Sequence, residues 1–427
     1  MIRYTQYLQK DFKFKILTFI CCILIIIIRC PELFINPRLF AEEGPFYFSN
    51  AFHYSNTNQW YKGLTYISIG YFSLWPNIAT TIAANFFTLE KAPLVTTLFA
   101  FVIQIAPIWI VLFGFSDFWE TKIQKLLLVL IILFVPISVE LWLTTITSQF
   151  TFGLIAFLIL HSKIESKKWI YRTLLIIGGL TGILTCLLTP FFILRGYFNK
   201  SKERRIQAII LTICTLFQLF IVYNNTIQRP PISNLILHNI IWAPIAQSFG
   251  YLVLGYHGSS IFYTLYKFAI TNHFFFLFSS LIIVTNLIVF AILIKYSKIK
   301  NLDKFTFLGS YFTILYISLI GALDDNYIQV GVGSRYFFIP NIILATFLLS
   351  SINYKLIKEK LLSQKLDLFF IFLMISIFWG MLKFPNKNWI SNKNCPTWPA
   401  EVRKWRQDNN YELQNCPSDF QKIKLAK

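Results

Sequence analysis

The chain has 427 residues, of which 56% are hydrophobic, 18% aromatic and only 14% charged, and its formal net charge is +20. Soluble domains carry about 25% charged residues, so this composition excludes an ordinary soluble protein. The basic residues form short clusters between apolar runs, a pattern that orients membrane proteins and argues against nucleic-acid binding.

Apolar segments of membrane length recur along the whole chain, as continuous runs without the alternation of a β-barrel strand. They predict an all-α, polytopic membrane protein with about 10–11 transmembrane or re-entrant helices. The first run, "KFKILTFICCILIIIIR" (13–29), has a basic start but no small-residue cleavage site, so it predicts an uncleaved transmembrane helix. Further single spans are expected at 93–114, 206–223, 274–295, 305–323, 336–352 and 366–383.

Two apolar segments predict helical hairpins. Residues 125–160 are broken by "VELWLTTITSQ", which predicts two short helices joined by a tight outer turn. Residues 173–194 are long enough for one crossing, yet both flanks are basic. The interruption "GGLTG" and Pro190 therefore predict a shallow or re-entrant hairpin, because irregular backbone at membrane depth must be buried in protein or line a cavity.

The basic clusters predict the orientation, because Lys and Arg are retained on the cytoplasmic side. They lie within 3–15, 161–172, 195–205, 295–300 and 353–365. With all of them inside, the amino terminus is cytoplasmic and the carboxyl terminus is outside. A bundle, residues 1–383, then carries the outer loops 30–92 and 224–273, and residues 384–427 form a short extracytoplasmic tail. Amphipathic, aromatic stretches such as "SLWPNIATTIAANF" predict a lid or cavity above the bundle.

Glu42 and Glu43 stand side by side in "NPRLFAEEGPFYFSNAF" (36–52), although the whole chain has only 19 acidic residues. A charged group beside a bilayer is costly and is usually kept for function. One carboxylate of a pair can take a proton or hold a metal ion while the other positions an acceptor. Because the two residues are adjacent, we expect their side chains to diverge, and Gly44-Pro45 should hold one of the two carboxylates facing inward. A raised pKa would suit a base at that place. The alternative is a pair of solvated loop charges.

A second candidate group lies in "DDNYIQVGVGSRYFFIPN" (324–341), at the outer end of a span. The guanidinium of Arg335 suits bidentate binding of a phosphate or diphosphate, and Asp324 or Asp325 could pair with it. The alternative is an arginine that only snorkels to the interface. Glu140, near the outer end of another span, either contacts substrate or caps its turn.

These stretches resemble the GT-C superfamily of polytopic glycosyltransferases, which use sugars linked to lipid phosphates. An acidic pair in the first outer loop is similar to the signature of that superfamily. "YISIGYFSLWPNIATTIA" (66–83) resembles the amphipathic periplasmic helices that follow this loop, and "SRYFFIP" (334–340) resembles an Arg-Tyr…Pro element of a late helix. "WPAEVRKWRQDNNYELQNCP" (398–417) resembles the short periplasmic end of bacterial members with an AEEG or AEDG loop.

The resemblance implies an enzyme of a bacterial inner membrane that transfers a sugar, with inversion, from a polyprenyl-phosphate donor to a glycan or lipid acceptor at the periplasmic face. Glu42 or Glu43 would deprotonate the acceptor hydroxyl, and a cation would neutralise the leaving phosphate. That cation is expected to be Arg335, helped by Lys62 or Arg38. The resemblance favours Glu42 as the inward base or metal ligand, because the family-like pattern accepts Asp or Glu at the second position, so Asp should be tolerated at position 43. The other expected substrate contacts are Tyr66, Tyr71, Glu140 and Tyr336. A divalent cation is left open as a cofactor, and membrane lipids, but no nucleic acid, are expected partners.

Three other functions stay open at this point. A polysaccharide polymerase or ligase would rely on Arg and His in a large outer loop, here His238 and His257. A lipid-linked glycan transporter or flippase would need charged residues in the middle of the spans, and these are nearly absent. The third alternative is a non-catalytic scaffold.

The tail also contains two cysteines, Cys395 and Cys416, each within an Asn-Cys-Pro triplet. In an oxidising compartment the two thiols could form a disulfide that closes a loop of about 20 residues.

Overall fold

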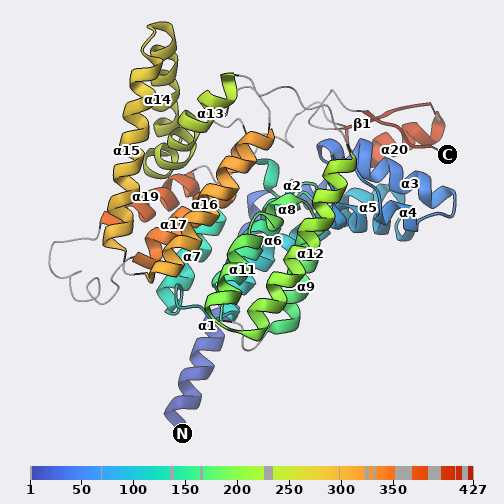
Figure 1. The fold of residues 1–427 in the computed structure, drawn as a ribbon. Coiled ribbons are helices and arrows are strands. Elements are labelled where there is room, and N and C mark those ends of the chain that lie inside the picture. The colour runs from blue at the N-terminus through green and yellow to red at the C-terminus, as the bar shows by residue number, and fades with distance from the viewer. Residues whose placement is uncertain are drawn as a thin grey trace.

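A computed structural model describes residues 2–68, 70–134, 139–163, 167–225, 234–297, 299–322, 327–329, 333–351, 368–382, 396–408, 410–415 and 422–426. Within these residues the chain is almost entirely helical (Figure 1). The described strands are β1 (Leu413–Gln414) and β2 (Lys422–Ile423), which pair antiparallel. The all-α class predicted from the sequence is confirmed.

The first half of the chain forms α1 to α12, with short 3-10 or π turns between some of them. Their bounds are α1 (Ile2–Arg29), α2 (Glu32–Ile35), η1 (Ala41–Glu43), η2 (Gly44–Phe48), α3 (Ser49–Asn56), α4 (Tyr61–Leu64), α5 (Leu74–Phe86), η3 (Leu89–Lys91), α6 (Ala92–Phe113), α7 (Lys122–Phe134), η4 (Val139–Leu141), α8 (Ser148–His161), α9 (Lys168–Gly179), α10 (Ile183–Cys186), α11 (Thr189–Phe198) and α12 (Lys202–Asn224). The second half has α13 (Asn234–Pro244), η5 (Ile245–Gly250), α14 (Tyr251–Thr271), α15 (Phe275–Tyr296), α16 (Asn301–Ala322), α17 (Ser334–Ser351), α19 (Leu368–Leu382) and α20 (Trp398–Gln407).

In the described part of the chain, four helical stretches are long and apolar enough to cross a membrane. They are Leu89–Phe113, Lys202–Asn224, Phe275–Ile292 and Asn301–Gly321. Each coincides with an expected span. Of the three other expected spans, 336–352 and 366–383 correspond to the shorter apolar helices α17 and α19, and 13–29 lies within α1, which is not among these four stretches. The segment 224–273, expected as an outer loop, instead forms the helices α13 and α14 where it is described.

In both segments expected to form helical hairpins, 125–160 and 173–194, two helical parts are joined by a turn, although α7 packs mainly on α6, α17 and α19 and not on α8. Helix α9 ends at Gly179, the chain turns, and α10 and α11 return beside α12. Gly182 makes this turn at φ +114°, and a Cβ there would lie 2.5 Å from the Gln149 side-chain oxygen, so only glycine fits without strain. In 125–160, α7 and α8 are joined through η4 and the following turn, residues 139–147.

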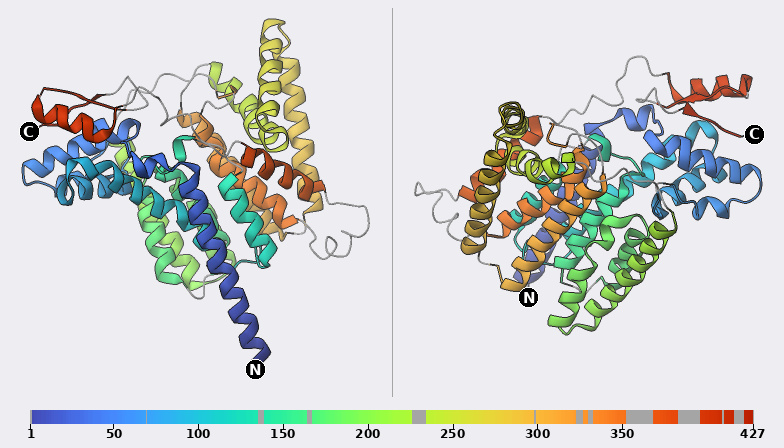
Figure 2. Two further views of the ribbon diagram at one scale, coloured as in Figure 1. Left: turned by 180° about the vertical axis from the view of Figure 1, so that it is seen from behind. Right: turned by 45° about the horizontal axis from the view of Figure 1, so that its top comes forward.

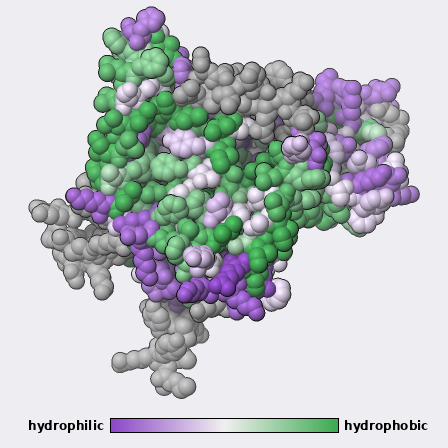
Figure 3. All heavy atoms as spheres, in the orientation of Figure 1, coloured by the Kyte–Doolittle hydropathy of each residue, from purple (hydrophilic) through white to green (hydrophobic). Residues whose placement is uncertain are grey.

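The two chain ends lie at opposite ends of the molecule (Figures 1 and 2). The α8–α9, α11–α12 and α15–α16 connections, which carry three of the basic clusters, lie toward the end where α1 begins (Figure 1). Figure 3 shows an apolar middle zone, with hydrophilic residues gathered at the end where α1 begins and on the lobe around α3, α4 and α20. The cluster 353–365 lies outside the described residues.

The described part of the carboxyl-terminal tail packs against this lobe. Trp398 donates its indole N–H to the Leu89 carbonyl at 2.8 Å. One buried apolar cluster joins the two parts: Leu39, Phe48, Ala83, Leu89, Ala92 and Val95 from the first outer segment and the beginning of α6, and Trp398, Val402, Trp405, Leu413, Ile423 and Leu425 from the tail. Burial of these side chains at about 25 cal/mol per Å² is what holds the tail to the lobe. We call this unit, residues 30–92 with 396–426, the outer lobe.

Candidate functional site

The acidic pair occupies a tight turn at the junction of the outer lobe and the bundle. Ala41 begins η1 with φ +45°, a conformation that non-glycine residues seldom adopt. The Glu43 amide donates to the Phe40 carbonyl at 2.9 Å, and the Glu43 carboxylate accepts from the Phe40 amide at 3.2 Å. This reciprocal pair has the pattern of a helix capping box. As predicted for adjacent residues, the two glutamates have different surroundings.

Glu43, and not Glu42, is directed inward: Glu43 is only 2% exposed, whereas Glu42 is half-buried, so the expectation that Glu42 faces inward is wrong. Its Oε1 accepts hydrogen bonds from the Thr145 hydroxyl and, at 3.4 Å, from the Thr145 amide. Burial raises the pKa of the Glu43 carboxyl above its ordinary value, and these hydrogen bonds oppose the rise. Glu43 therefore fastens the acidic turn to the 139–147 turn.

Glu42 is half-buried and lies on the other side of the turn. It is within electrostatic range of Arg335, Tyr71 and Tyr47. Glu42 thus lies within electrostatic range of one cation and several phenols, whereas Glu43 is enclosed by hydroxyl and amide donors.

Arg335 lies in the first turn of α17 and connects this helix to the turn between α7 and α8. Its Nη1 donates to Glu140 Oε2 at 2.9 Å, and its Nη2 donates to the Tyr336 hydroxyl at 3.2 Å. The guanidinium carbon also lies 5.1 Å from the centre of the Tyr336 ring. The side chains of Arg335 and Glu140 are 37% and 40% exposed, so this ion pair is accessible to solvent.

Tyr71 completes the group from the outer lobe. Its hydroxyl accepts a hydrogen bond from Gln149 Nε2 at 2.8 Å, and burial raises the pKa of Tyr71 to about 12. Tyr336 and Arg335 are among its electrostatic neighbours. Tyr71 therefore stays a neutral hydrogen-bond donor or acceptor throughout the ordinary pH range.

Of the residues singled out from the sequence, Arg335 contacts Glu140 and Tyr336 directly. Glu42 and Tyr71 lie within electrostatic range of Arg335, and Glu43 is held separately by Phe40 and Thr145. Tyr66 packs against the buried Tyr47, and the centroids of the two rings are 6.0 Å apart. Asp324 and Asp325 lie outside the described residues.

Two predicted phosphate ligands lie elsewhere. Arg38 is 4% exposed and donates to the carbonyls of Pro396 at 2.6 Å and Gln414 at 2.5 Å, so its guanidinium holds the tail and not a substrate. The Arg38 guanidinium carbon also lies 5.5 Å from the centre of the Trp398 ring, which is a further contact with the tail. Lys62 is exposed on α4, at the edge of the outer lobe and away from α17 (Figure 1).

Several residues of the site were not singled out from the sequence: Tyr47, Thr145 and Gln149. The run "LTTITSQ" between α7 and α8 could have indicated Thr145 and Gln149, because three threonines and a glutamine in one tight turn are unusual between apolar helices. Thr144 and Thr147 hydrogen-bond to each other and to the Glu140 carbonyl, which shapes the turn that presents Glu140 and Thr145.

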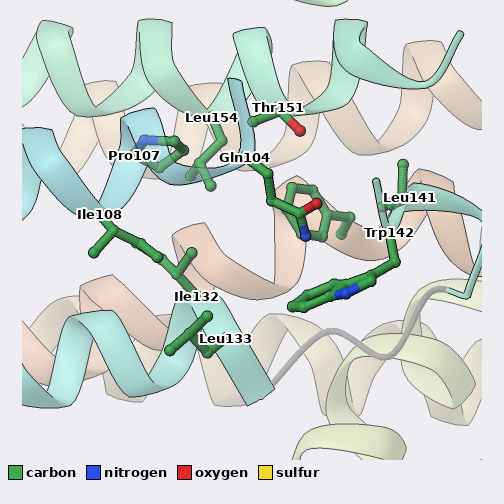
Figure 4. A pocket seen from close by; sticks show the side chains of 10 residues that line it. Gln104, Pro107, Ile108, Ile132, Leu133, Leu141, Trp142, Thr151 and Leu154 are labelled. Atoms are coloured by element: carbon green, nitrogen blue, oxygen red, sulfur yellow. The ribbon is translucent and has the colours of Figure 1, made fainter. Parts of the chain in front are cut away.

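A cavity lies on the bundle side of the same turn. Figure 4 shows it between Trp142 on one side and Gln104 and Thr151 on the other. The remaining lining is apolar: Pro107, Ile108, Ile132, Leu133, Leu141, Leu154 and Phe338. None of the predicted site residues lines this cavity, although Leu141 and Trp142 belong to the turn that carries Glu140.

The histidines of the alternative function are surrounded by aromatic rings. His238 Nδ1 lies 3.0 Å from the Tyr266 hydroxyl, and its ring is 4.0 Å from that of Phe275. The His257 ring lies 5.9 Å from the Trp379 ring. Within the described ranges, no group of three or more His, Cys, Asp or Glu side chains is arranged to hold a metal ion.

No family model matches the chain, and neither the curated proteins nor the solved structures contain a match to it. The geometry of the group around Glu42 and Arg335 is therefore the basis for a functional assignment.

Proposed function

We propose that this chain is a polytopic membrane glycosyltransferase of the GT-C type, which transfers a sugar from a polyprenyl-phosphate donor to a glycan or lipid acceptor. The apolar helices support a membrane location, and the basic connections at one end of the bundle support a cytoplasmic amino terminus. In that orientation the outer lobe and the acidic turn face the periplasm of a bacterial inner membrane.

The observation that carries the proposal is that the two carboxylates, Glu42 and Glu43, have different surroundings. Glu43 is enclosed by donors from Phe40 and Thr145, whereas Glu42 is half-buried beside Arg335. A general base needs access to the acceptor hydroxyl, and a cation nearby must meet the negative charge that develops on the leaving group. Glu42 and Arg335 meet these two requirements.

In the proposed reaction Glu42 takes the proton of the acceptor hydroxyl while the acceptor oxygen bonds to the anomeric carbon of the sugar. The bond from that carbon to the phosphate oxygen breaks, and the polyprenyl phosphate leaves with its electron pair. Arg335 stabilises the additional charge on the phosphate. Attack on the face opposite the leaving group inverts the anomeric configuration.

The test compares two isosteric substitutions. Mass spectrometry of surface glycans from a deletion strain identifies the missing product, and plasmid-borne variants are then assayed for restoring it. Glu42→Gln should abolish restoration, because an amide cannot accept the proton. Glu43→Gln should retain it, because an amide can still bond to both Phe40 and Thr145. Full restoration by Glu42→Gln at the parent protein level would refute the assignment of the base.

A further inference from the structure

The outer lobe is formed from two segments that are more than 300 residues apart in the chain, and hydrogen bonds join them along their length. Arg38 donates to Pro396 and Gln414, as described above. At the edge of the lobe, Asn56 donates to the Ala426 carbonyl at 3.1 Å. At the acidic turn the donor belongs to the tail, since Asn415 donates to the Ala41 carbonyl at 2.7 Å.

The tail contacts the chain on both sides of the acidic pair. Asn415 is 2% exposed and holds the carbonyl of Ala41, the residue before Glu42. Gly44, the residue after Glu43, lies against Ile423, and a Cβ at Gly44 would be 2.4 Å from Ile423 Cδ1. The acidic pair is therefore held between a hydrogen bond and an apolar contact, and both come from the last residues of the tail.

The hydrogen bond from Asn415 to Ala41 matters because Ala41 has an unfavourable backbone conformation. A non-glycine residue at φ +45° is held there only when its surroundings impose it. The hydrogen bond from Asn415 fixes the orientation of the peptide group that follows Ala41, and this peptide group directs the Glu42 side chain. Without that bond, the peptide group is free to rotate toward an ordinary φ, and Glu42 would turn away from Arg335.

We propose that the carboxyl-terminal tail positions the acidic turn and that Asn415 is its positioning residue. The proposal rests on the function proposed above insofar as the correct orientation of Glu42 is needed for transfer. Asn415 acts through the Ala41 carbonyl and has no role at the reacting atoms. The tail thus does more than cover apolar surface, since it sets the direction of the base.

The chain supplies a matched control. Asn415→Ala and Asn56→Ala each remove one amide donor that bridges the two segments of the outer lobe, but only Asn415 is bonded to the acidic turn. Both variants are made in a cysteine-free background that carries Glu42→Cys, and the rate of alkylation at position 42 by a membrane-impermeant maleimide is measured. We expect Asn415→Ala to change this rate at least threefold and Asn56→Ala to leave it within error. An unchanged rate in Asn415→Ala would overturn the proposal.

A second variant separates positioning from general loss of structure. Ala41→Gly lowers the conformational cost of the positive φ, so the double variant Ala41→Gly/Asn415→Ala should recover much of the parent labelling rate. In the Glu42 protein, Asn415→Ala should lower kcat about tenfold with little change in KM, and Ala41→Gly should again restore it. No recovery in the double variant would show a general structural role and would reject positioning. A shift in labelling in a protein without transferase activity would support positioning and refute the proposed function instead.

Discussion

Arg335 Nη1 lies 2.9 Å from Glu140 Oε2, although the two residues are 195 positions apart in the chain. The second nitrogen of the guanidinium is used by the Tyr336 hydroxyl. Since both members of the ion pair are more than one-third exposed, their attraction is screened and worth about 0.2–1 kcal/mol. Under the proposed function, a substrate phosphate would displace Glu140 at that small cost, and Glu140 would then compete with the phosphate for the cation.

The first prediction follows from this competition. Glu140→Gln should strengthen the binding of farnesyl phosphate to the purified protein by up to about fivefold, the equivalent of about 1 kcal/mol. Calorimetry in detergent measures the dissociation constant. Arg335→Ala, alone or together with Glu140→Gln, should remove most of the binding. Weaker binding by Glu140→Gln would mean that the carboxylate helps to hold the ligand and does not compete with it.

The second prediction concerns Glu43 and pH. Because burial raises its pKa, the folded protein binds the proton more tightly than the unfolded chain does. The stabilising contribution is therefore complete below the ordinary carboxyl pKa of about 4.3 and is lost as pH rises through the raised value. Thermal unfolding of the purified protein from about pH 4 to pH 8 should show this loss, and Glu43→Gln should remove that part of the pH dependence.

Substitutions that shorten Glu43 should destabilise the outer lobe. Glu43→Ala leaves the buried Thr145 hydroxyl without this partner and creates a cavity, at a cost of about 2–4 kcal/mol. Glu43→Asp, which the sequence alone predicts to be tolerated, is one methylene too short to reach both Phe40 and Thr145. We now expect it to lower the unfolding temperature. A Glu43→Asp protein as stable as the parent would contradict this account of the turn.

Many of the apolar helices of the bundle could be predicted from the sequence, because apolar runs and their interrupting glycines and prolines are local signals. The segment 92–113 is an example, since its apolar composition alone specifies α6. The helices α13 and α14, in the segment expected as an outer loop, were not predicted. The role of Arg38 could not be predicted, because its partner Gln414 is 376 positions away and no local pattern records that pairing. Because Glu42 and Glu43 are adjacent, the sequence predicts that their side chains point in different directions. It does not predict that Glu43 is buried, because this depends on its contact with Thr145 in the turn between α7 and α8.

The third prediction concerns orientation across the membrane. Trp60 is 51% exposed on the outer lobe, and Lys200 is exposed in the basic connection between α11 and α12. Single cysteines placed at 60 and 200 in a cysteine-free background should therefore react with an impermeant reagent from opposite sides of the membrane. Position 60 should react in intact spheroplasts, and position 200 should react only after lysis. Labelling of both positions in intact spheroplasts would disprove the proposed orientation.

The last prediction concerns Cys395 and Cys416, which both lie outside the described residues. Their described neighbours are close together, because the two terminal nitrogens of Arg38 bind the carbonyls of Pro396 and Gln414. The Arg38 guanidinium thus joins Pro396, one residue after Cys395, to Gln414, two residues before Cys416. If the outer lobe faces an oxidising compartment, we expect the two thiols to form a disulfide.

A disulfide that closes a loop of about 20 residues should stabilise the lobe by about 3 kcal/mol. Peptide mass spectrometry without reduction should detect the linked pair, and a reducing agent should lower the unfolding temperature of the parent but not that of a Cys395→Ser/Cys416→Ser variant. Arg38→Met provides a control for the hydrogen bonds, since it should weaken the lobe in both redox states. Free thiols at both positions in protein purified without reductant would count against the disulfide, and labelling at position 60 would then decide whether the compartment or the pairing was wrongly predicted.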